Sequence, residues 1–201
     1  MQNSNILELL INTSRIYKEK LLNKNILFIY GNVNSPLHFE AIFLKNNFLH
    51  LTGVKYKKGS NNFFDKLISN RMKESEIQKR KDGTTDLKIN ALPLLNNIFK
   101  STKIIGDYDS TKFKLYTDKL AGGVNACIGF IKKNNYYIPN TLLSEDIRTI
   151  TNVPRYRVLA IFRKNKNEKT YNELCYLAKG IKLSEIKITK PCKDLISDSL
   201  L

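Results

Sequence analysis

The sequence has few of the residues that build cross-linked or metal-bound proteins. Its 201 residues include three cysteines, two histidines and no tryptophan. Cys127, Cys175 and Cys192 are odd in number and widely spaced, which argues against a disulfide framework and against a CxxC metal knuckle. Two histidines are also too few for a typical zinc site. We therefore expect no metal and no other cofactor.

Long apolar runs are missing as well. No stretch approaches the roughly 18 uninterrupted apolar residues of a membrane-spanning helix, and the first residues lack the basic and apolar regions of a secretory signal. Apolar residues nevertheless make up 42% of the chain, which is enough to bury a core. These features predict a soluble, cytoplasmic protein without a membrane partner.

Acidic residues are scarce relative to basic ones. Asp and Glu number 18 against 34 Lys and Arg, which gives a formal net charge of +16. On a folded domain this excess favours a polyanionic partner, because each neutralised phosphate releases counterions, and nucleic acid is the first candidate. The alternative is a merely solvated lysine face. The candidate nucleic-acid contacts include the basic turn Lys79, Arg80 and Lys81, and two arginines able to bind phosphate, Arg155 and Arg157.

Two kinds of periodicity divide the chain. Apolar residues recur at helical intervals over 5–22, 62–72 and 90–101, and a short helix is expected at 142–148. Runs typical of strands occupy 26–30, 36–43, 48–54, 104–105, 113–116, 126–131, 136–138, 158–162 and 171–177. Helices that mostly precede strands predict the α+β class, with N-terminal helices packed on one face of an antiparallel sheet.

The domain organisation is simple. There is no internal repeat or low-complexity tract, so we expect a single α+β domain over 1–186. The remaining residues, 187–201, are polar with a few scattered apolar side chains. They are predicted to form a loosely attached C-terminal tail. Nothing in the sequence specifies the oligomeric state.

One histidine stands in a position suited to acid–base chemistry. His50 lies between Leu49 and Leu51 and just before Thr52 and Gly53, where the end of a strand can present a side chain to a cleft. The alternative is a histidine that is hydrogen-bonded in the core or exposed at a strand edge. His38 has the weaker claim, because it lies on the polar face of an ordinary strand.

Several other residues could bind a phosphate or a base. Lys119 precedes Gly122-Gly123, whose amides could approach a phosphate, although a plain turn is the alternative. Asn140 and Thr141 offer an amide and a hydroxyl at a strand end, where a helix cap is the default. Asp107 and Asp109 are typical of an Asx turn rather than a magnesium site. Four tyrosines could stack on bases, namely Tyr108, Tyr116, Tyr136 and Tyr137, and half-buried positions in the sheet are the alternative.

Seven blocks taken in order resemble one known family, the phage barnase-EndoU-colicin-RelE-like nucleases of type four (PBECR4). The blocks are HLTG at 50–53, IGDY at 105–108, KLYTDKLAG at 114–122, GF at 129–130, YYIPNT at 136–141, EDIR at 145–148 and RVLAI at 157–161. The resemblance runs from about residue 5 to about residue 186. It implies an α+β fold, an origin in a phage or mobile element, and a metal-independent ribonuclease in the bacterial cytoplasm.

The resemblance also implies roles for individual residues. His50 would be the general base or acid, and Lys119 and Arg148 would stabilise the charge on phosphorus. Asn140 or Thr141 would orient the phosphate. Such enzymes often pair a glutamate base with a histidine, and Glu145 is the weaker candidate for that base.

The function expected is therefore a toxin-like ribonuclease that cuts RNA by transesterification. The alternative is a non-catalytic basic module that blocks a nucleic-acid-dependent host defence system. RNA is the expected partner, and the candidate protein partners are an antitoxin and a host defence complex. A third hypothesis is a virion-packaged protein without activity of its own.

Overall fold

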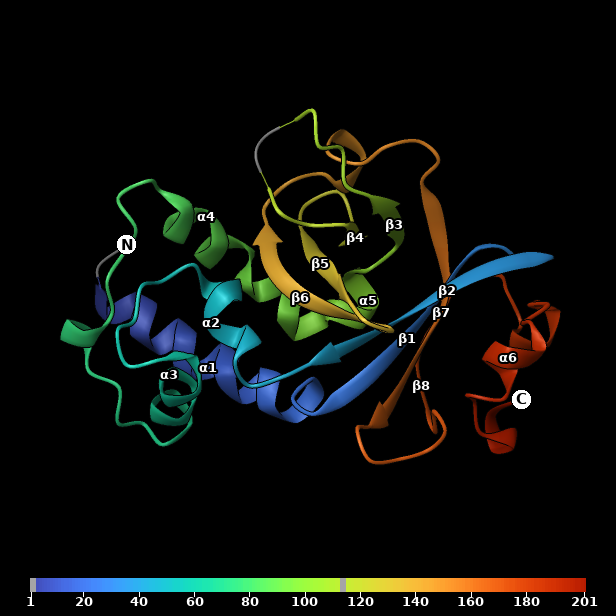
Figure 1. The fold of residues 1–201 in the computed structure, drawn as a ribbon, viewed down its shortest axis with the longest axis horizontal. Helices are drawn as coiled ribbons and strands as arrows, with labels where there is room; N and C mark the ends of the chain where they lie inside the picture. The colour runs from blue at the N-terminus through green and yellow to red at the C-terminus, as the bar shows by residue number, and fades with distance from the viewer. Residues whose placement is uncertain (1–2, 113–114) are drawn as a thin grey trace.

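A computed structural model describes residues 3–112 and 115–201, with N-terminal helices at one end and the C-terminal helix at the opposite end (Figure 1). The α-helices are α1 (Asn3–Lys20), α2 (Asn47–Thr52), α3 (Ser60–Ile68), α4 (Thr84–Ala91), α5 (Ile98–Ser101) and α6 (Lys190–Lys193). Short 3-10 helices are η1 (Glu74–Glu76), η2 (Leu92–Asn97), η3 (Ile147–Thr149), η4 (Leu183–Glu185) and η5 (Asp198–Leu200). None of the described helices has the length and apolar character needed to cross a membrane.

The strands form a barrel. They are β1 (Lys24–Asn32), β2 (Ser35–Phe43), β3 (Ile104–Asp107), β4 (Lys119–Gly122), β5 (Cys127–Lys133), β6 (Tyr136–Leu143), β7 (Tyr156–Asn165) and β8 (Glu173–Leu177). Their order is β1-β2-β6-β5-β4-β3-β7-β8, and a pairing of β1 with β7 closes the first seven into a ring. All neighbours are antiparallel except β2 and β6.

The α+β class is therefore confirmed, but the expected open antiparallel sheet is wrong. The sheet closes because β7 is ten residues long, so that β1 pairs along one edge while β3 and β8 share the other. The parallel contact of β2 with β6 makes the barrel mixed. Helices α1 to α4 lie together at one end of this barrel instead of covering one face of a sheet (Figure 1).

One seam of the barrel is short. β2 and β6 share a single register pair, Ala41 opposite Tyr137, in the described part of the chain. The preceding residues of β2, 35–40, therefore have β1 as a neighbour on one edge and no paired strand on the other. The barrel closes through this single pair, next to the hairpin that joins β5 to β6.

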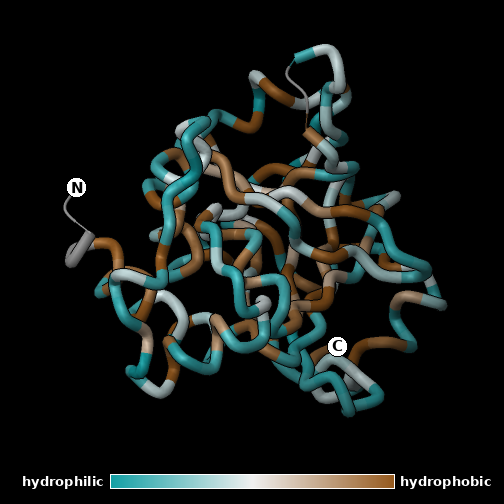
Figure 2. Tube along the Cα trace, turned by 60° about the vertical axis from the view of Figure 1, so that its left-hand side comes forward, coloured by the Kyte–Doolittle hydropathy of each residue, from teal (hydrophilic) through white to brown (hydrophobic). Residues whose placement is uncertain are grey.

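Aromatic rings fill the barrel. Phe28 stacks on Phe39 with ring centroids 4.7 Å apart, and Phe130 contacts both rings edge-on. On the helical side, buried Tyr17 of α1 packs edge-on against Phe43 and other rings. Figure 2 shows residues of high hydropathy gathered in the centre and hydrophilic ones in the outer loops. This core fixes the helices relative to the barrel end.

The C-terminal segment 187–201, predicted as a loosely attached tail, packs on the outside of β1 and β7. Cys192 and Ile196 are each 2% exposed and belong to a second apolar cluster with Leu27, Leu159 and other residues. Tyr171 forms a parallel bridge with Ile196. Burial of these side chains holds the segment in place.

Local differences from the predicted elements have simple causes. The run 48–54 forms α2 and its cap instead of a strand, because Phe48, Leu51 and Thr52 are buried with the i, i+3, i+4 spacing of a helix. The helix predicted over 90–101 is divided among α4, η2 and α5. The expected helix 142–148 is limited to η3. In the expected strand 113–116, residues 113–114 lie outside the described residues and 115–116 are irregular.

Candidate functional site

Positive charge gathers at the C-terminal end of α2, where His50 lies in the last turn. The ammonium of Lys88, on α4, donates to the His50 carbonyl oxygen at 2.8 Å. Arg80 Nε donates to the Gly53 carbonyl oxygen at 3.2 Å, and Thr85 Oγ1 donates to the same oxygen at 2.8 Å. Cations from two separate segments are thus fixed beside the last turn that carries the imidazole.

The local sequence explains this arrangement. The last carbonyls of a helix have no partner within the helix, and cations are favoured beside them. Gly53 ends α2 in the left-handed conformation, with φ +68°. A Cβ at this position would lie 2.9 Å from Lys88 Cδ and 3.2 Å from the Thr84 carbonyl oxygen. The glycine therefore also makes room for the Lys88 stem.

The charges around His50 change its acid–base behaviour. Partial burial, then Lys88, Arg80 and Lys133, lower the pKa of His50 below its usual 6.5, although the residue is exposed. Burial and Arg80 lower the pKa of Lys88 to about 8. At neutral pH the imidazole is therefore free to accept a proton, and Lys88 still carries one that it can donate. We call His50, Arg80, Lys88 and Lys133 the His50 cluster.

The His50 cluster lacks an ion-paired carboxylate. Among the described residues, no salt bridge joins Arg80, Lys88 or Lys133 to an acidic group. Asp82 is close enough for Arg80 to contribute to lowering its pKa, but its carboxylate accepts the backbone N–H of Thr84. The cluster therefore keeps an uncompensated positive charge that favours an anionic ligand.

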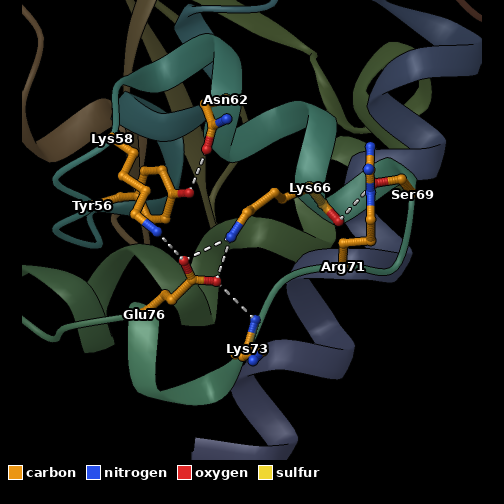
Figure 3. A network of polar contacts seen from close by, with 8 residues as sticks. All are labelled: Tyr56, Lys58, Asn62, Lys66, Ser69, Arg71, Lys73 and Glu76. Atoms are coloured by element: carbon orange, nitrogen blue, oxygen red, sulfur yellow. Dashed lines mark hydrogen bonds and ion pairs between the residues drawn. The ribbon is translucent and has the colours of Figure 1, made fainter.

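Neighbouring lysines show the opposite arrangement (Figure 3). Glu76 accepts from Lys58 at 2.9 Å and from Lys66 at 2.7 Å, and these hydrogen bonds lower the pKa of its carboxyl to about 2. The amide of Lys73 donates to the same carboxylate at 3.3 Å. Salt bridges thus compensate the charge of Lys58 and Lys66, whereas Arg80, Lys88 and Lys133 have no such partner among the described residues.

The four residues predicted as catalytic are not brought together. Lys119, on β4, pairs with Asp107 of β3 at 2.5 Å. The guanidinium of Arg148 is bound by Asp146 at 2.6 Å. Thr141 is 2% exposed, and its hydroxyl has no hydrogen-bond partner among the described residues. Only His50 of these four belongs to the cluster.

The predicted nucleic-acid contacts have separate surroundings. Arg80 belongs to the His50 cluster, Lys79 pairs with Asp86 at 2.7 Å, and Lys81 is exposed. The other three are bound to the protein itself: Arg155 donates to Thr151, Arg157 to the Lys179 carbonyl, and Asn140 to the Tyr116 carbonyl. Only the 79–81 turn therefore adjoins the cluster.

Lys88 and Lys133 are the residues that sequence reasoning missed. Lys88 is 38 positions from His50, and no motif links the two. Lys133 comes from the end of β5. The one local signal is Gly53, since a glycine directly after an apolar helical run is typical of a C-cap that attracts cations. In the described ranges, no three His, Cys, Asp or Glu side chains gather as ligands for a metal ion.

Comparison with known proteins gives one match. The family described as phage-Barnase-EndoU-ColicinE5/D-RelE like nuclease4, PBECR4, matches residues 9–180. No curated protein and no solved structure matches the chain. The match spans most of the sequence and agrees with the resemblance of its ordered blocks. The chain therefore belongs to the PBECR4 family of nuclease-like domains.

Proposed function

We propose that this protein is a ribonuclease that works without a metal ion and cuts RNA by transesterification at the His50 cluster, as expected of a phage or mobile-element nuclease. The observation that carries the proposal is an exposed imidazole with a lowered pKa beside three cations that have no ion-paired carboxylate among the described residues. Perturbed acid–base groups that gather at one place are typical of catalytic sites.

Each step of the reaction has a suitable group in the cluster. His50 accepts the proton of the ribose 2′-hydroxyl, whose oxygen attacks the neighbouring phosphorus. Arg80 and Lys133 stabilise the negative charge that develops on the phosphoryl oxygens. The bond from phosphorus to the 5′-oxygen breaks, and Lys88 gives that oxygen its proton. The products are a 2′,3′-cyclic phosphate and a free 5′-hydroxyl.

The surface beside the cluster suits a polyanion. Segment 55–81 contains nine Lys and Arg against three Asp and Glu. The exposed Lys81 follows Arg80 directly, so that the turn can contact a phosphate next to the scissile one. Lys119 and Arg148 lie outside this surface and have no role in the proposed cleavage step.

Cleavage of a mixed-sequence RNA oligonucleotide in the presence of a chelator tests the proposal. His50→Gln is expected to slow cleavage by about 10²–10⁴-fold, because it removes the base. Lys88→Met keeps the aliphatic stem beside Gly53 and removes the acid. Lys166→Met is the matched control, since this lysine is exposed and its side chain has no partner among the described contacts. Equal rates for the parent, His50→Gln and Lys88→Met would contradict the proposal.

A non-catalytic RNA-binding module is the second candidate, because the basic excess of segment 55–81 extends beyond the cluster. In that case the parent binds RNA in a filter-binding assay without cutting it. His50→Gln then binds as tightly as the parent, whereas replacing Lys79, Arg80 and Lys81 by glutamate weakens binding. A host defence complex blocked by this surface would be the partner.

A further inference from the structure

The barrel mouth holds a second polar site, at the short seam between β2 and β6. A cavity of about 360 Å³ opens there, and its lining includes Tyr30, His38, Glu40, Lys119, Lys132 and Tyr137. β2 contributes the imidazole and the carboxylate, and the hairpin joining β5 to β6 forms the opposite wall. The cavity lies at this seam, where β2 and β6 share one register pair among the described residues.

Lys119 lines this cavity close to two aromatic rings. Its ammonium lies 5.8 Å from the ring centroid of Tyr30 and 6.0 Å from that of Tyr137, and it pairs with Asp107. Only 13% of the Lys119 side chain is exposed. The rings and the carboxylate therefore fix a cation whose charge is already compensated.

Tyr30 has a hydroxyl without a partner. The residue is 5% exposed and lines the cavity, and no hydrogen bond of its hydroxyl occurs within the described part of the chain. Burial, Asp107 and Tyr156 raise its pKa to about 12, so the hydroxyl keeps its proton at any physiological pH. Buried tyrosine hydroxyls usually have a partner, so this one is available to a ligand.

The charge of the mouth differs from that of the His50 cluster. Lys119 pairs with Asp107, and the lining holds the carboxylate of Glu40 as well as Lys132; Glu40 also accepts the Tyr171 hydroxyl at 2.6 Å. Such a site offers little net attraction for a phosphate. It offers aromatic faces, a hydroxyl, an imidazole and a carboxylate, which suit a flat, uncharged ring with hydrogen-bonding edges.

We propose that the barrel mouth is a pocket for a single unstacked nucleobase. Its role in choosing a base of the bound RNA strand rests on the proposed ribonuclease function. Adjacent residues connect the two sites: Lys132 lines the mouth, and Lys133 belongs to the His50 cluster. Side chains of successive residues in a β-strand point to opposite faces, so Lys132 and Lys133 face the two sites. An RNA strand that passes over the edge of this hairpin therefore contacts both sites.

Uncharged nucleosides test the pocket, because they have no phosphate for the His50 cluster. Adenosine, guanosine, cytidine and uridine are added to the whole protein at millimolar concentration, and the ring signals of the two histidines are followed by NMR. We expect at least one nucleoside to shift the His38 signals and to leave those of His50 in place. Absence of any shift at His38 would overturn the proposal.

Two variants keep the test specific. Tyr137→Ala is expected to weaken nucleoside binding by about tenfold through loss of stacking, and Tyr30→Phe to weaken it through loss of the free hydroxyl. Tyr116→Ala is the matched control, because this tyrosine is 84% exposed and does not line the cavity. Unchanged binding by Tyr137→Ala would also overturn the pocket. Nucleoside binding without RNA cleavage would contradict the ribonuclease alone, and cleavage without nucleoside binding the pocket alone.

Discussion

The His50 cluster and the barrel mouth use lysine in opposite ways. At His50, Lys88 donates to a carbonyl oxygen and has no ion-paired carboxylate among the described residues, so its charge remains available. Burial and Arg80 lower its pKa to about 8. At the mouth, Lys119 pairs with Asp107 between two tyrosine rings. The comparison teaches that the counter-charge of a lysine decides whether the site attracts an anion or shapes a cavity.

The two regions also differ in how the fold builds them. The cluster depends on a helix end, where Gly53 and its carbonyl receive side chains from α4 and from the 79–81 turn. The mouth depends on strand alternation, which directs Tyr30 and Lys119 into the barrel. Changes in the barrel core should therefore disturb both regions, whereas changes at Gly53 should disturb only the first.

The largest expected effect is a loss of stability from a change in the barrel core, which should disturb the His50 cluster and the barrel mouth alike. Phe130→Ala empties a buried position that contacts Phe28, Phe39 and Phe43, and should lower the free energy of unfolding by about 3–5 kcal/mol. Tyr116→Ala, at an exposed position, should stay within about 0.5 kcal/mol of the parent. Urea denaturation followed by circular dichroism measures both, and similar losses would contradict the assigned core.

A change at Gly53 should affect the cluster alone. Gly53→Ala strains a left-handed backbone and pushes against Lys88 and the Thr84 carbonyl, at a cost of about 1–3 kcal/mol. Gly180→Ala is matched in backbone conformation, with φ +80°, but has no atom within 4 Å of the new Cβ, so it should cost about 1 kcal/mol. The first variant should also cleave RNA more slowly. Equal stability and equal cleavage for both variants would contradict the packing of Lys88 on Gly53.

The pH dependence of cleavage should show the titration of His50 and of Lys88. The rate should rise with pH through the lowered pKa of His50, below 6.5, and fall as Lys88 loses its proton near pH 8. On each sloping limb of the profile the rate should change about tenfold per pH unit, which corresponds to about 1.4 kcal/mol. Lys88→Met should lose the alkaline limb in a single-turnover assay. An unchanged alkaline limb in this variant would assign the acid to another group.

The smallest expected effects are changes in the pKa of His50 and of Tyr137, which test whether the two regions respond separately. Lys88→Met removes a charge that lowers the pKa of His50, so this pKa should rise. Lys119→Met removes the charge that lowers the pKa of Tyr137, so the tyrosine pKa should rise while that of His50 stays unchanged. NMR titration measures both. A response of His50 to Lys119→Met would show that the two sites are electrostatically coupled.

The sequence predicts the class of the fold better than its closure. Helical and strand periodicity give the α+β class because each pattern is local, as for α1 and for Phe39, Ala41 and Phe43 of β2. The pairing of β1 with β7 joins residues more than a hundred positions apart, such as Phe28 and Ile161, and leaves no local pattern. An open sheet was therefore the natural but incorrect expectation.

The residues of the candidate site also divide into those that the sequence could indicate and those that only the fold brings together. His50 and Arg80 could be selected because their residue types and flanking residues suggest phosphate chemistry. Lys88 and Lys133 could not, because they approach His50 only through the packing of α4 and the end of β5. Local sequence likewise could not show that Thr141 is buried or that Asp146 forms a salt bridge with Arg148.

The central claim is that the cations around His50 form an anion site, and one titration tests it most directly. The pKa of the His50 ring is measured by NMR in sodium chloride and in sodium sulfate at equal ionic strength, with His38 reporting any general salt effect. We predict a pKa below 6.5 in chloride that rises in sulfate, because a bound anion offsets Lys88, Arg80 and Lys133. A pKa of His50 that is the same in both salts would contradict the account.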